Sequence, residues 1–250
     1  MDLDELREDW TRLGAEDPLW AVYVAPGTRG GRWDVDEFFA LGGEEVSRAL
    51  GELDRLGLSP GSRVAVDFGC GVGRLSAALA QRFTEVIGVD ISPTMLAEAK
   101  RLDRSDGRCR FVLNEADNLA FIPDGSVDLV YSSLVLQHLP ADLATGYVRE
   151  FARILAPDGV AVFQVASRPT VSFKGMVFRF APWPVLRWAQ RRLLGYPAPM
   201  RMTGLRRSAI RRSLAPMKAR IVARVRDDSY GGHWHYDRYY ARRSPSAARR

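Results

Sequence analysis

Residues 64–79 read Val64-Ala65-Val66-Asp67-Phe68-Gly69-Cys70-Gly71-Val72-Gly73-Arg74-Leu75-Ser76-Ala77-Ala78-Leu79, and this stretch decides the fold. Val64 to Phe68 is a short apolar run of the kind found in buried strands, and the residues from Leu75 onward have helical spacing. The glycines between them, at every second position, allow a tight turn that side chains would block. The stretch therefore predicts a strand, a glycine turn and a helix, a unit typical of open α/β sheets.

The glycine turn also predicts a ligand, because it brings backbone N–H groups and a helix N-terminus close to a nucleotide-like molecule at the carboxyl ends of the strands. The dinucleotide fingerprint G-x-G-x-x-G is not matched, since Arg74 stands at its last position and Gly73 comes one residue early. Asp67, two residues before the first glycine, would repel a pyrophosphate but attract an ammonium or sulfonium group. We therefore expect a pocket for a cationic nucleoside.

An acid followed by G-x-G-x-G, from Asp67 to Gly73, resembles the first motif of the class I S-adenosylmethionine-dependent methyltransferases. The resemblance implies S-adenosylmethionine as the cofactor and contacts from this loop to its methionine part. A glycine loop alone is weak support, since many turns are glycine-rich for steric reasons. The loop residues assigned to the cofactor are Asp67, Gly69, Cys70, Gly71, Gly73 and Arg74.

A second acid ends the next apolar run, residues 85–90, and lies 23 residues after Asp67. A carboxylate at this place can accept hydrogen bonds from both hydroxyls of a ribose. We therefore predict that Asp90 binds the ribose. The resemblance adds Ile91 and Met95 as residues that pack against the adenine.

A third strand, residues 110–113, is followed by a loop that contains Asp117 and Asn118. The resemblance implies that Asp117 accepts a hydrogen bond from the adenine amino group and that Asn118 lies beside it. The alternative is a surface loop rich in acids. Three acids after successive strands, Asp67, Asp90 and Asp117, indicate the family more specifically than any one of them.

The fourth strand, residues 126–133, continues as Leu134-Val135-Leu136-Gln137-His138 and resembles the fourth motif of enzymes that methylate small molecules. The resemblance places Ser133 and Leu134 beside the sulfonium and His138 near the mouth of the site. A histidine that titrates near neutrality could remove the proton of a hydroxyl acceptor, so His138 is the candidate catalytic base and a candidate substrate contact. The alternative is that His138 only orients the substrate or packs.

Residues 1–58 predict an N-terminal helical cap. Asp34 can N-cap a short helix, and residues 44–56 read as a further helix. In the resembled family such caps close over the donor and help to form the substrate pocket. The substrate-binding candidates in the cap are Tyr23, Trp33 and Phe39, although aromatic residues at helical spacing are more often plain packing.

An insertion follows the fifth predicted strand, residues 160–165. Residues 168–202 interleave aromatic and aliphatic side chains with arginine and proline. The pattern is compatible with a substrate lid, with an amphipathic segment that touches anionic lipid, or with a packed insertion.

The closing elements are a helix from Thr203 and a hairpin of residues 220–225 and 233–241. By its resemblance to the family, the chain is expected to be of the α/β class: a Rossmann-like doubly wound sheet of seven strands, the last of them antiparallel. The methyltransferase domain is expected to span residues 59–243, and residues 244–250 read as a flexible tail.

Composition limits the class of protein. The 250 residues can form one domain with a small cap, and 46% hydrophobic and 26% charged residues are typical of a soluble globular protein. Two cysteines make no disulfide framework, and the acidic start resembles no signal peptide. No apolar stretch is long enough to span a membrane. We therefore expect a cytoplasmic protein without a transmembrane segment.

The net charge of +6 conceals a division between two parts of the chain. Residues 1–158 contain 27 acids and 16 bases, whereas residues 159–226 contain no acid and fifteen bases. The basic part could bind an anionic partner, including a membrane surface, or only balance the acidic part. Nearly all the bases are arginine, which a GC-rich coding bias would also produce.

These observations predict a methyltransferase that acts on a small molecule, with an anionic or amphipathic acceptor as a candidate. Such a reaction is an in-line displacement, to which the protein contributes by aligning the reactants and excluding water. No metal is expected, because three histidines and two cysteines lack ligand spacing. The alternatives are RNA methylation by the basic C-terminal part, a nucleoside-binding protein without catalysis and, more remotely, a nicotinamide-dependent oxidoreductase. The sequence favours a small molecule over a nucleic acid and does not indicate the oligomeric state.

Overall fold

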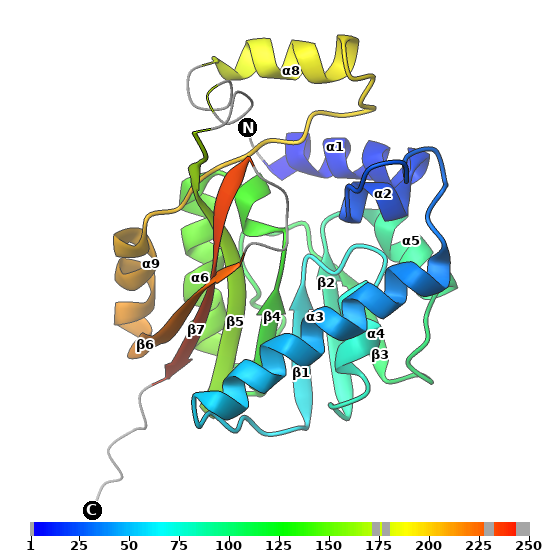
Figure 1. Ribbon diagram of the computed structural model, residues 1–250. Coiled ribbons are helices and arrows are strands. Elements are labelled where there is room, and N and C mark those ends of the chain that lie inside the picture. The colour runs from blue at the N-terminus through cyan, green and yellow to red at the C-terminus, as the bar shows by residue number, and fades with distance from the viewer. Residues whose placement is uncertain (1–2, 172–175, 177–180, 228–232, 244–250) are drawn as a thin grey trace, which may run out of the picture.

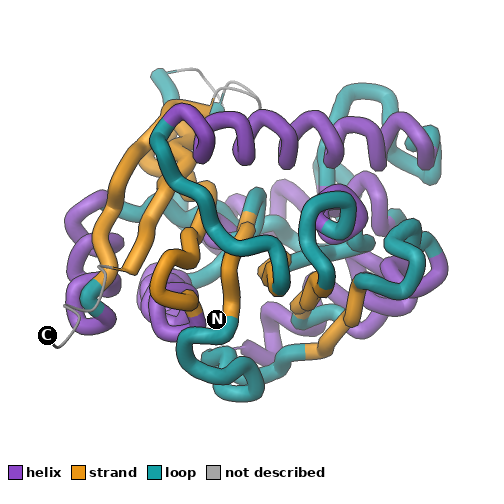
Figure 2. Tube along the Cα trace, turned by 90° about the horizontal axis from the view of Figure 1, so that it is seen from below, coloured by secondary structure: helices purple, strands orange, loops and turns teal. Residues whose placement is uncertain are grey.

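The computed structural model describes residues 3–171, 176, 181–227 and 233–243, and it contains a seven-stranded sheet of order β3-β2-β1-β4-β5-β7-β6 with helices on both faces (Figures 1 and 2). The first five strands are parallel, and β7 is antiparallel to both β5 and β6. The predicted seven-stranded Rossmann-like sheet with an antiparallel last strand is therefore confirmed. The strands are β1 (Val64–Phe68), β2 (Glu85–Asp90), β3 (Cys109–Leu113), β4 (Val127–Ser132), β5 (Leu155–Pro169), β6 (Ala219–Asp227) and β7 (Trp234–Arg243).

The chain changes direction across the sheet at β1. It passes from β1 to β2 and β3 on one side, then returns to place β4 on the other side of β1. In open α/β sheets such a switch point leaves a crevice at the carboxyl ends of the strands, because the two flanking connections leave on opposite faces. The topology therefore places the candidate site beside the ends of β1, β2 and β4.

Two layers of helices cover the sheet. Helices α3 (Val35–Arg55) and α4 (Arg74–Leu79) pack on one face, and α6 (Ala141–Ile154) and α9 (Arg207–Leu214) pack on the other. All six residues of β4 are buried, as expected for a central parallel strand with helices on both faces. Helix α5 (Pro93–Arg101) follows β2, and the short 3₁₀ turns η1 (Leu136–His138) and η2 (Ala215–Met217) precede α6 and β6.

One difference from the sequence prediction lies in α3, which is a single helix of 21 residues rather than two shorter helices. Asp34 is its N-cap, as predicted, and accepts a hydrogen bond from the N–H of Glu37 at 2.8 Å. Two adjacent glycines lie inside the helix and do not interrupt it. Gly42 faces α4 so closely that an added Cβ would lie 2.7 Å from the carbonyl oxygen of Arg74. Close packing between the helices, not a break, explains this glycine.

Two other boundaries differ from the prediction. Strand β5 begins at Leu155 rather than at residue 160, because Leu155 already pairs with Val127 and residues 156–159 form an irregularity within the strand. Helix α9 begins at Arg207 rather than at Thr203, whose N–H donates to the Gln137 carbonyl at 2.6 Å.

The cap and the insertion meet above the carboxyl ends of the parallel strands. Helices α1 (Leu3–Glu16) and α2 (Pro18–Val22) lie directly over the strand ends, and α8 (Trp183–Arg192) lies outside α1 (Figure 1). The predicted tail, residues 244–250, lies outside the described residues. Among the described helices, none is long and apolar enough to cross a bilayer.

Candidate functional site

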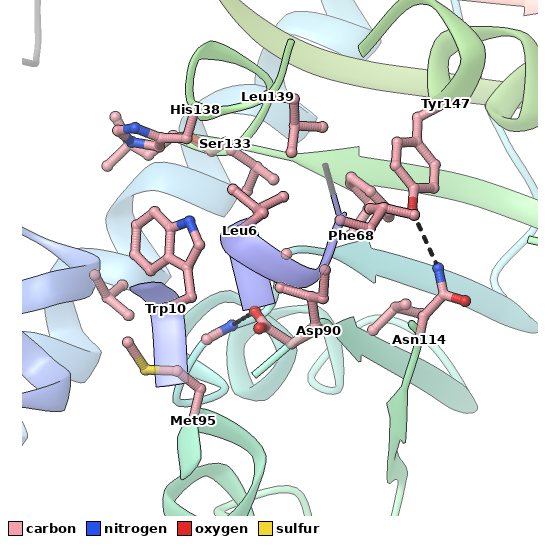
Figure 3. Close-up of a pocket in the computed structure, with 18 residues that line it drawn as sticks. Leu6, Trp10, Phe68, Asp90, Met95, Asn114, Ser133, His138, Leu139 and Tyr147 are labelled. Carbon is pink, nitrogen blue, oxygen red and sulfur yellow. Dashed lines mark hydrogen bonds between the residues drawn. The ribbon is translucent and has the colours of Figure 1, made fainter. Parts of the chain in front are cut away.

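A cavity opens at the carboxyl ends of β1, β2 and β4 and is covered by α1 (Figure 3). The topological switch point thus coincides with a real hollow in the structure. Eight of the predicted site residues line it, and these are Gly69, Gly71, Asp90, Ile91, Met95, Ser133, Leu134 and His138.

The glycine loop has the backbone conformation that the sequence predicts. Gly69, Gly71 and Gly73 have φ values of 74°, 52° and 81°, in the left-handed region that favours glycine. Space also requires glycine, since a Cβ at Gly69 would lie 2.2 Å from a methyl group of Val135. The loop therefore allows close approach on the cavity side.

The N–H groups of this loop are directed into the protein. Those of Gly69 and Cys70 both donate to the Val89 carbonyl, at 2.7 and 3.0 Å, and that of Gly71 donates to the Asp90 carboxylate. The N–H of Gly73 donates to the carbonyl of Cys70. The expectation that these backbone donors face a ligand is therefore wrong for four of the loop residues. A phosphate would find few donors here, which leaves a cationic or neutral ligand as the better match.

Asp90 joins the loop to the end of β2. One carboxylate oxygen accepts from the N–H of Gly71 at 2.8 Å, the dashed line at Asp90 in Figure 3. The other accepts from the N–H of Ser92 at 2.9 Å. Burial raises the pKa of Asp90 above its ordinary value, and the hydrogen bonds from Ser92 and Gly71 oppose that rise. Each oxygen keeps a second lone pair, so Asp90 can still accept two further hydrogen bonds in the cavity.

Asp67 lies behind the loop and does not line the cavity. It is 1% exposed, and its Oδ2 accepts from the Ser76 hydroxyl at 2.6 Å. Its Oδ1 is buried and has no hydrogen-bond partner among the residues that the structure describes. Burial raises the pKa of Asp67 to about 7. A donor or cation that reached this side of the loop would satisfy the unpaired oxygen.

Helix α1 supplies residues that the sequence prediction missed. Leu6 and Trp10 lie between Asp90 and Met95 on one side and Ser133 on the other (Figure 3), and Leu3 also lines the cavity. The sequence shows the helical spacing of the apolar residues in α1, but it does not show that the apolar face of α1 covers this cavity. The helix is fixed to the start of α5, where the hydroxyls of Ser92 and Thr94 donate to the carbonyls of Trp10 and Thr11 at 3.2 and 2.8 Å.

The polar residues after β3 differ from those predicted. Asn114, directly after β3, lines the cavity, and its amide donates to the Tyr147 hydroxyl at 3.3 Å (Figure 3). Asp117 is exposed and accepts from the side chain of its neighbour Asn118 at 3.0 Å. Neither Asp117 nor Asn118 lines the cavity, because β3 ends at Leu113 and the chain turns outward after Asn114. The place of Asn114 directly after β3 is the sequence signal that could have predicted it as a residue of the cavity.

His138 lies at the mouth of the cavity against Trp10, with the two ring centroids 5.2 Å apart. Its Nδ1 is 2.7 Å from the Arg201 carbonyl, which can only accept, so Nδ1 carries the proton and Nε2 is the acceptor. Burial lowers the pKa of His138 to about 4, and the hydrogen bond to Arg201 opposes this change. The expectation that His138 titrates near neutrality is therefore wrong, and the ring is neutral at physiological pH.

Leu134 has an unusual backbone that the surrounding structure holds in place. Its φ is 61°, and its N–H donates to the side-chain oxygen of Gln164 at 3.1 Å. The amide of Gln164 in turn donates to Asp227 at 3.1 Å. A left-handed conformation is strained for leucine, and such strain persists only where neighbours fix it. The hydroxyl of Ser133, the residue before Leu134, is buried without a partner in the described part of the protein.

The other predicted loop residues are not brought to the cavity. Cys70 is buried and its pKa is well above the ordinary value because of burial. Gly73 is the N-cap of α4. Arg74 is 3% exposed and forms an ion pair with Glu45 at 2.9 Å. This pairing explains how an arginine lies in the loop without facing the ligand.

The aromatic candidates of the cap also lie elsewhere. The indole N–H of Trp33 donates to the Tyr23 carbonyl at 3.1 Å, and both rings belong to a cluster between α2 and α3. Phe39 packs in the same cluster, with the Arg104 guanidinium 4.4 Å from its ring centre. None of the three lines the cavity.

Residues 66–163 match a family model described as a methyltransferase domain. The chain is 42% identical over 127 residues to trans-aconitate 2-methyltransferase of Methylobacterium radiotolerans, and this match covers 48% of this chain and 46% of that protein. It is 30% identical over 156 residues to 2-methyl-6-phytyl-1,4-hydroquinone methyltransferase of Synechocystis, and this match covers 62% of this chain and 48% of that protein. The matched part thus spans about half the length of these relatives.

A solved structure matches almost the whole chain. Magnesium protoporphyrin IX methyltransferase from Synechocystis, crystallised with bound SAH, superimposes with a TM-score of 0.65 at 22% identity. The match covers 97% of this chain and 100% of that one. The two proteins share the fold.

Proposed function

We propose that the chain is a class I S-adenosylmethionine-dependent methyltransferase and that it transfers a methyl group from S-adenosylmethionine to a small-molecule acceptor. The observation that carries the proposal is the internal use of the glycine-loop N–H groups, which deprives a phosphorylated cofactor of its donors. The acceptors in the names of the relatives are small molecules, which favours such an acceptor over RNA.

The residues present fit this cofactor. Asp90 keeps free lone pairs for the ribose hydroxyls, and Ile91 and Met95 offer apolar surface to the adenine. One buried oxygen in the cavity wall has no partner among the described residues, Oγ of Ser133, and it would accept from or solvate the charged methionine part. When bound, S-adenosylmethionine supplies an activated methyl group and a good leaving group.

The protein's own contribution is mainly alignment and the exclusion of water. Leu6 and Trp10 of α1 cover the cavity from the solvent side. The fixed backbone of Leu134 forms its floor beside Ser133. These contacts would hold an acceptor against the reacting centre in a dry site.

His138 is the proposed base. Because its Nδ1 is held by the Arg201 carbonyl, Nε2 is the atom that would take a proton from a hydroxyl acceptor. With a pKa of about 4, the ring is ready to accept a proton at every pH from mildly acidic upward. The low pKa makes it a weak base, suited to a proton that leaves as the methyl group is transferred.

The cavity favours an acceptor with an apolar part. Its outer walls are Leu3, Leu6, Trp10 and Leu139, and no lysine or arginine is among the described residues that line it. A multiply charged anion would lose its hydration here without gaining a counter-ion. Of the two predicted acceptor types, the amphipathic one is therefore the better match.

The test measures binding and turnover separately. Calorimetry should detect S-adenosylhomocysteine binding to the purified chain, and thermal stabilisation by this ligand but not by NAD is expected. Asp90→Asn should weaken binding by about tenfold or more, since it replaces an acceptor of two hydrogen bonds. Asp117→Asn is the matched control and should leave affinity unchanged, because Asp117 is exposed outside the cavity.

Turnover is tested with labelled donor and a small-molecule extract. Label in a small product supports the proposal. Binding without any labelled product would indicate the non-catalytic alternative. Label in RNA, with retention on RNA at low salt, would indicate the other alternative.

A further inference from the structure

Helix α8 lies on the surface with an apolar face that nothing in the described structure covers. Of its ten residues only Gln190 is buried. Val185 and Trp188 in the helix are 52% and 57% exposed, and Leu193 and Leu194 at its end are 69% and 54% exposed. A helix this short depends on the burial of an apolar face for its stability, so the exposed face calls for a partner.

The exposure is concentrated in one part of the chain. Of the ten large hydrophobic residues that are exposed in the described structure, six lie between Val171 and Leu194. Single exposed apolar residues are normal, but a contiguous group indicates an interaction surface.

The inner side of α8 is attached to α1 by ion pairs. Arg187 contacts Glu5 at 3.2 Å, and Arg191 contacts Asp9 at 3.5 Å. The spacing of Val185, Trp188 and Arg192 by three and four residues places them on one stripe of the helix. Figure 1 shows α8 as the outermost element at this end of the molecule. The outward stripe is therefore available to a partner.

The outward stripe carries the cation Arg192 beside its apolar side chains. Residues 159–226 contain fifteen bases and no acid. Arg192 is exposed and forms no ion pair within the described ranges. Tryptophan and leucine beside arginine are the side chains that enter the interface of an anionic bilayer, where the rings and aliphatic groups leave water and guanidinium groups meet phosphates.

We infer that α8, with Leu193 and Leu194, is an interfacial helix that docks this protein on the surface of an anionic phospholipid bilayer. A second copy of the chain fits less well, because a two-fold contact through this face would oppose Arg192 to its own equivalent. A nucleic acid fits less well, because the middle of the face is apolar. Docking would also hold α1 and the cavity that it covers near the lipid surface, and this consequence alone rests on the proposed function.

The test is co-sedimentation of the purified full chain with vesicles at low salt. The probes are phosphatidylcholine vesicles and vesicles of phosphatidylcholine with phosphatidylglycerol. We expect binding to the anionic vesicles to be at least about tenfold tighter than to the neutral ones. The double variant Trp188→Ser with Leu194→Ser should weaken binding by about tenfold or more, because it removes most of the apolar area. Arg192→Glu should weaken binding about tenfold through its charge.

Control variants alter other exposed residues outside α8. Phe121→Ser removes an aromatic ring that is 43% exposed outside α8, and Arg211→Glu reverses an exposed charge on α9. Both should keep vesicle affinity within about twofold of the parent. Thermal melting and S-adenosylhomocysteine binding of each variant show that the chain is folded, independently of vesicle binding.

Three outcomes would overturn the inference. The first is no binding of the parent chain to anionic vesicles. The second is an equal loss in the α8 variants and the controls. The third is light scattering that shows a dimer dissociated by Trp188→Ser, which would identify the face as a contact between copies.

Discussion

Replacement of two adjacent glycines by alanine should change stability in opposite directions. Gly42 and Gly43 both lie inside α3, where glycine costs about 1 kcal/mol relative to alanine. A Cβ at Gly43 would meet nothing within 4 Å, so Gly43→Ala should stabilise the protein by about 0.5–1 kcal/mol. A Cβ at Gly42 would lie 2.6 Å from Cγ of Arg74 and 2.7 Å from its carbonyl oxygen.

The magnitude at Gly42 follows from what surrounds Arg74. The Arg74 side chain is held by its ion pair with Glu45 at 2.9 Å. The second atom that the new Cβ would meet is the Arg74 carbonyl oxygen, which belongs to the backbone of α4. Neither the side chain nor the carbonyl can move away without breaking the ion pair or shifting a helix. Overpacking of this kind costs about 1–3 kcal/mol, which exceeds the helix-propensity gain. Because both variants share the helix-propensity gain, we expect Gly42→Ala to be about 1–3 kcal/mol less stable than Gly43→Ala, a difference of roughly 2–12 °C in Tm for a chain of this length.

Urea unfolding followed by circular dichroism measures this difference. Gly51→Ala, also in α3 with open space at its Cβ, serves as a second control and should resemble Gly43→Ala. Because Arg74 begins α4 directly after the glycine loop, Gly42→Ala should also bind S-adenosylhomocysteine more weakly than Gly43→Ala does. Equal stability of the Gly42 and Gly43 variants would refute the packing argument.

Three further predictions concern buried polar groups. Asp67 has a pKa of about 7 in the folded protein, so between about pH 4 and 7 the Asp67 carboxyl is protonated only in the folded state. The free energy of unfolding that Asp67 contributes therefore falls by about 1.4 kcal/mol per pH unit as pH rises and is lost above pH 7. Urea midpoints from pH 5 to 8 should show this pH dependence in the parent and not in Asp67→Asn. His138→Asn should lower kcat by a factor of about 10²–10⁴ and leave S-adenosylhomocysteine affinity unchanged. The kcat of the parent should fall only as pH approaches 4, where His138 becomes protonated and can no longer act as a base. An undiminished kcat in the variant would assign His138 to packing. Gln164→Leu leaves the N–H of Leu134 without its acceptor, so it should lower the free energy of unfolding in urea by about 1–3 kcal/mol and weaken S-adenosylhomocysteine binding. An unchanged affinity would show that the Leu134 backbone does not shape the cavity.

The sequence by itself determined the order of elements and the centre of the site. A glycine turn between a strand and a helix is a local signal, since left-handed φ values at Gly69 and Gly71 depend on few neighbours. The acid at the end of β2 is also local, and Asp90 lies in the cavity as its place in the chain predicts. The N-cap at Asp34 belongs to the same class of signals.

Only the tertiary structure decided which side chains reach the cavity and how they are charged. Trp10 covers the site because α1 is fixed to α5, a contact between segments about 80 residues apart that no local pattern contains. Asp117 lies outside the cavity because the chain turns outward at Asn114. The pKa of His138 follows from burial beneath distant parts of the chain, and the continuity of α3 through Gly42 follows from its contact with α4. Local periodicity specifies elements, whereas burial, charge and access depend on neighbours that the fold brings together.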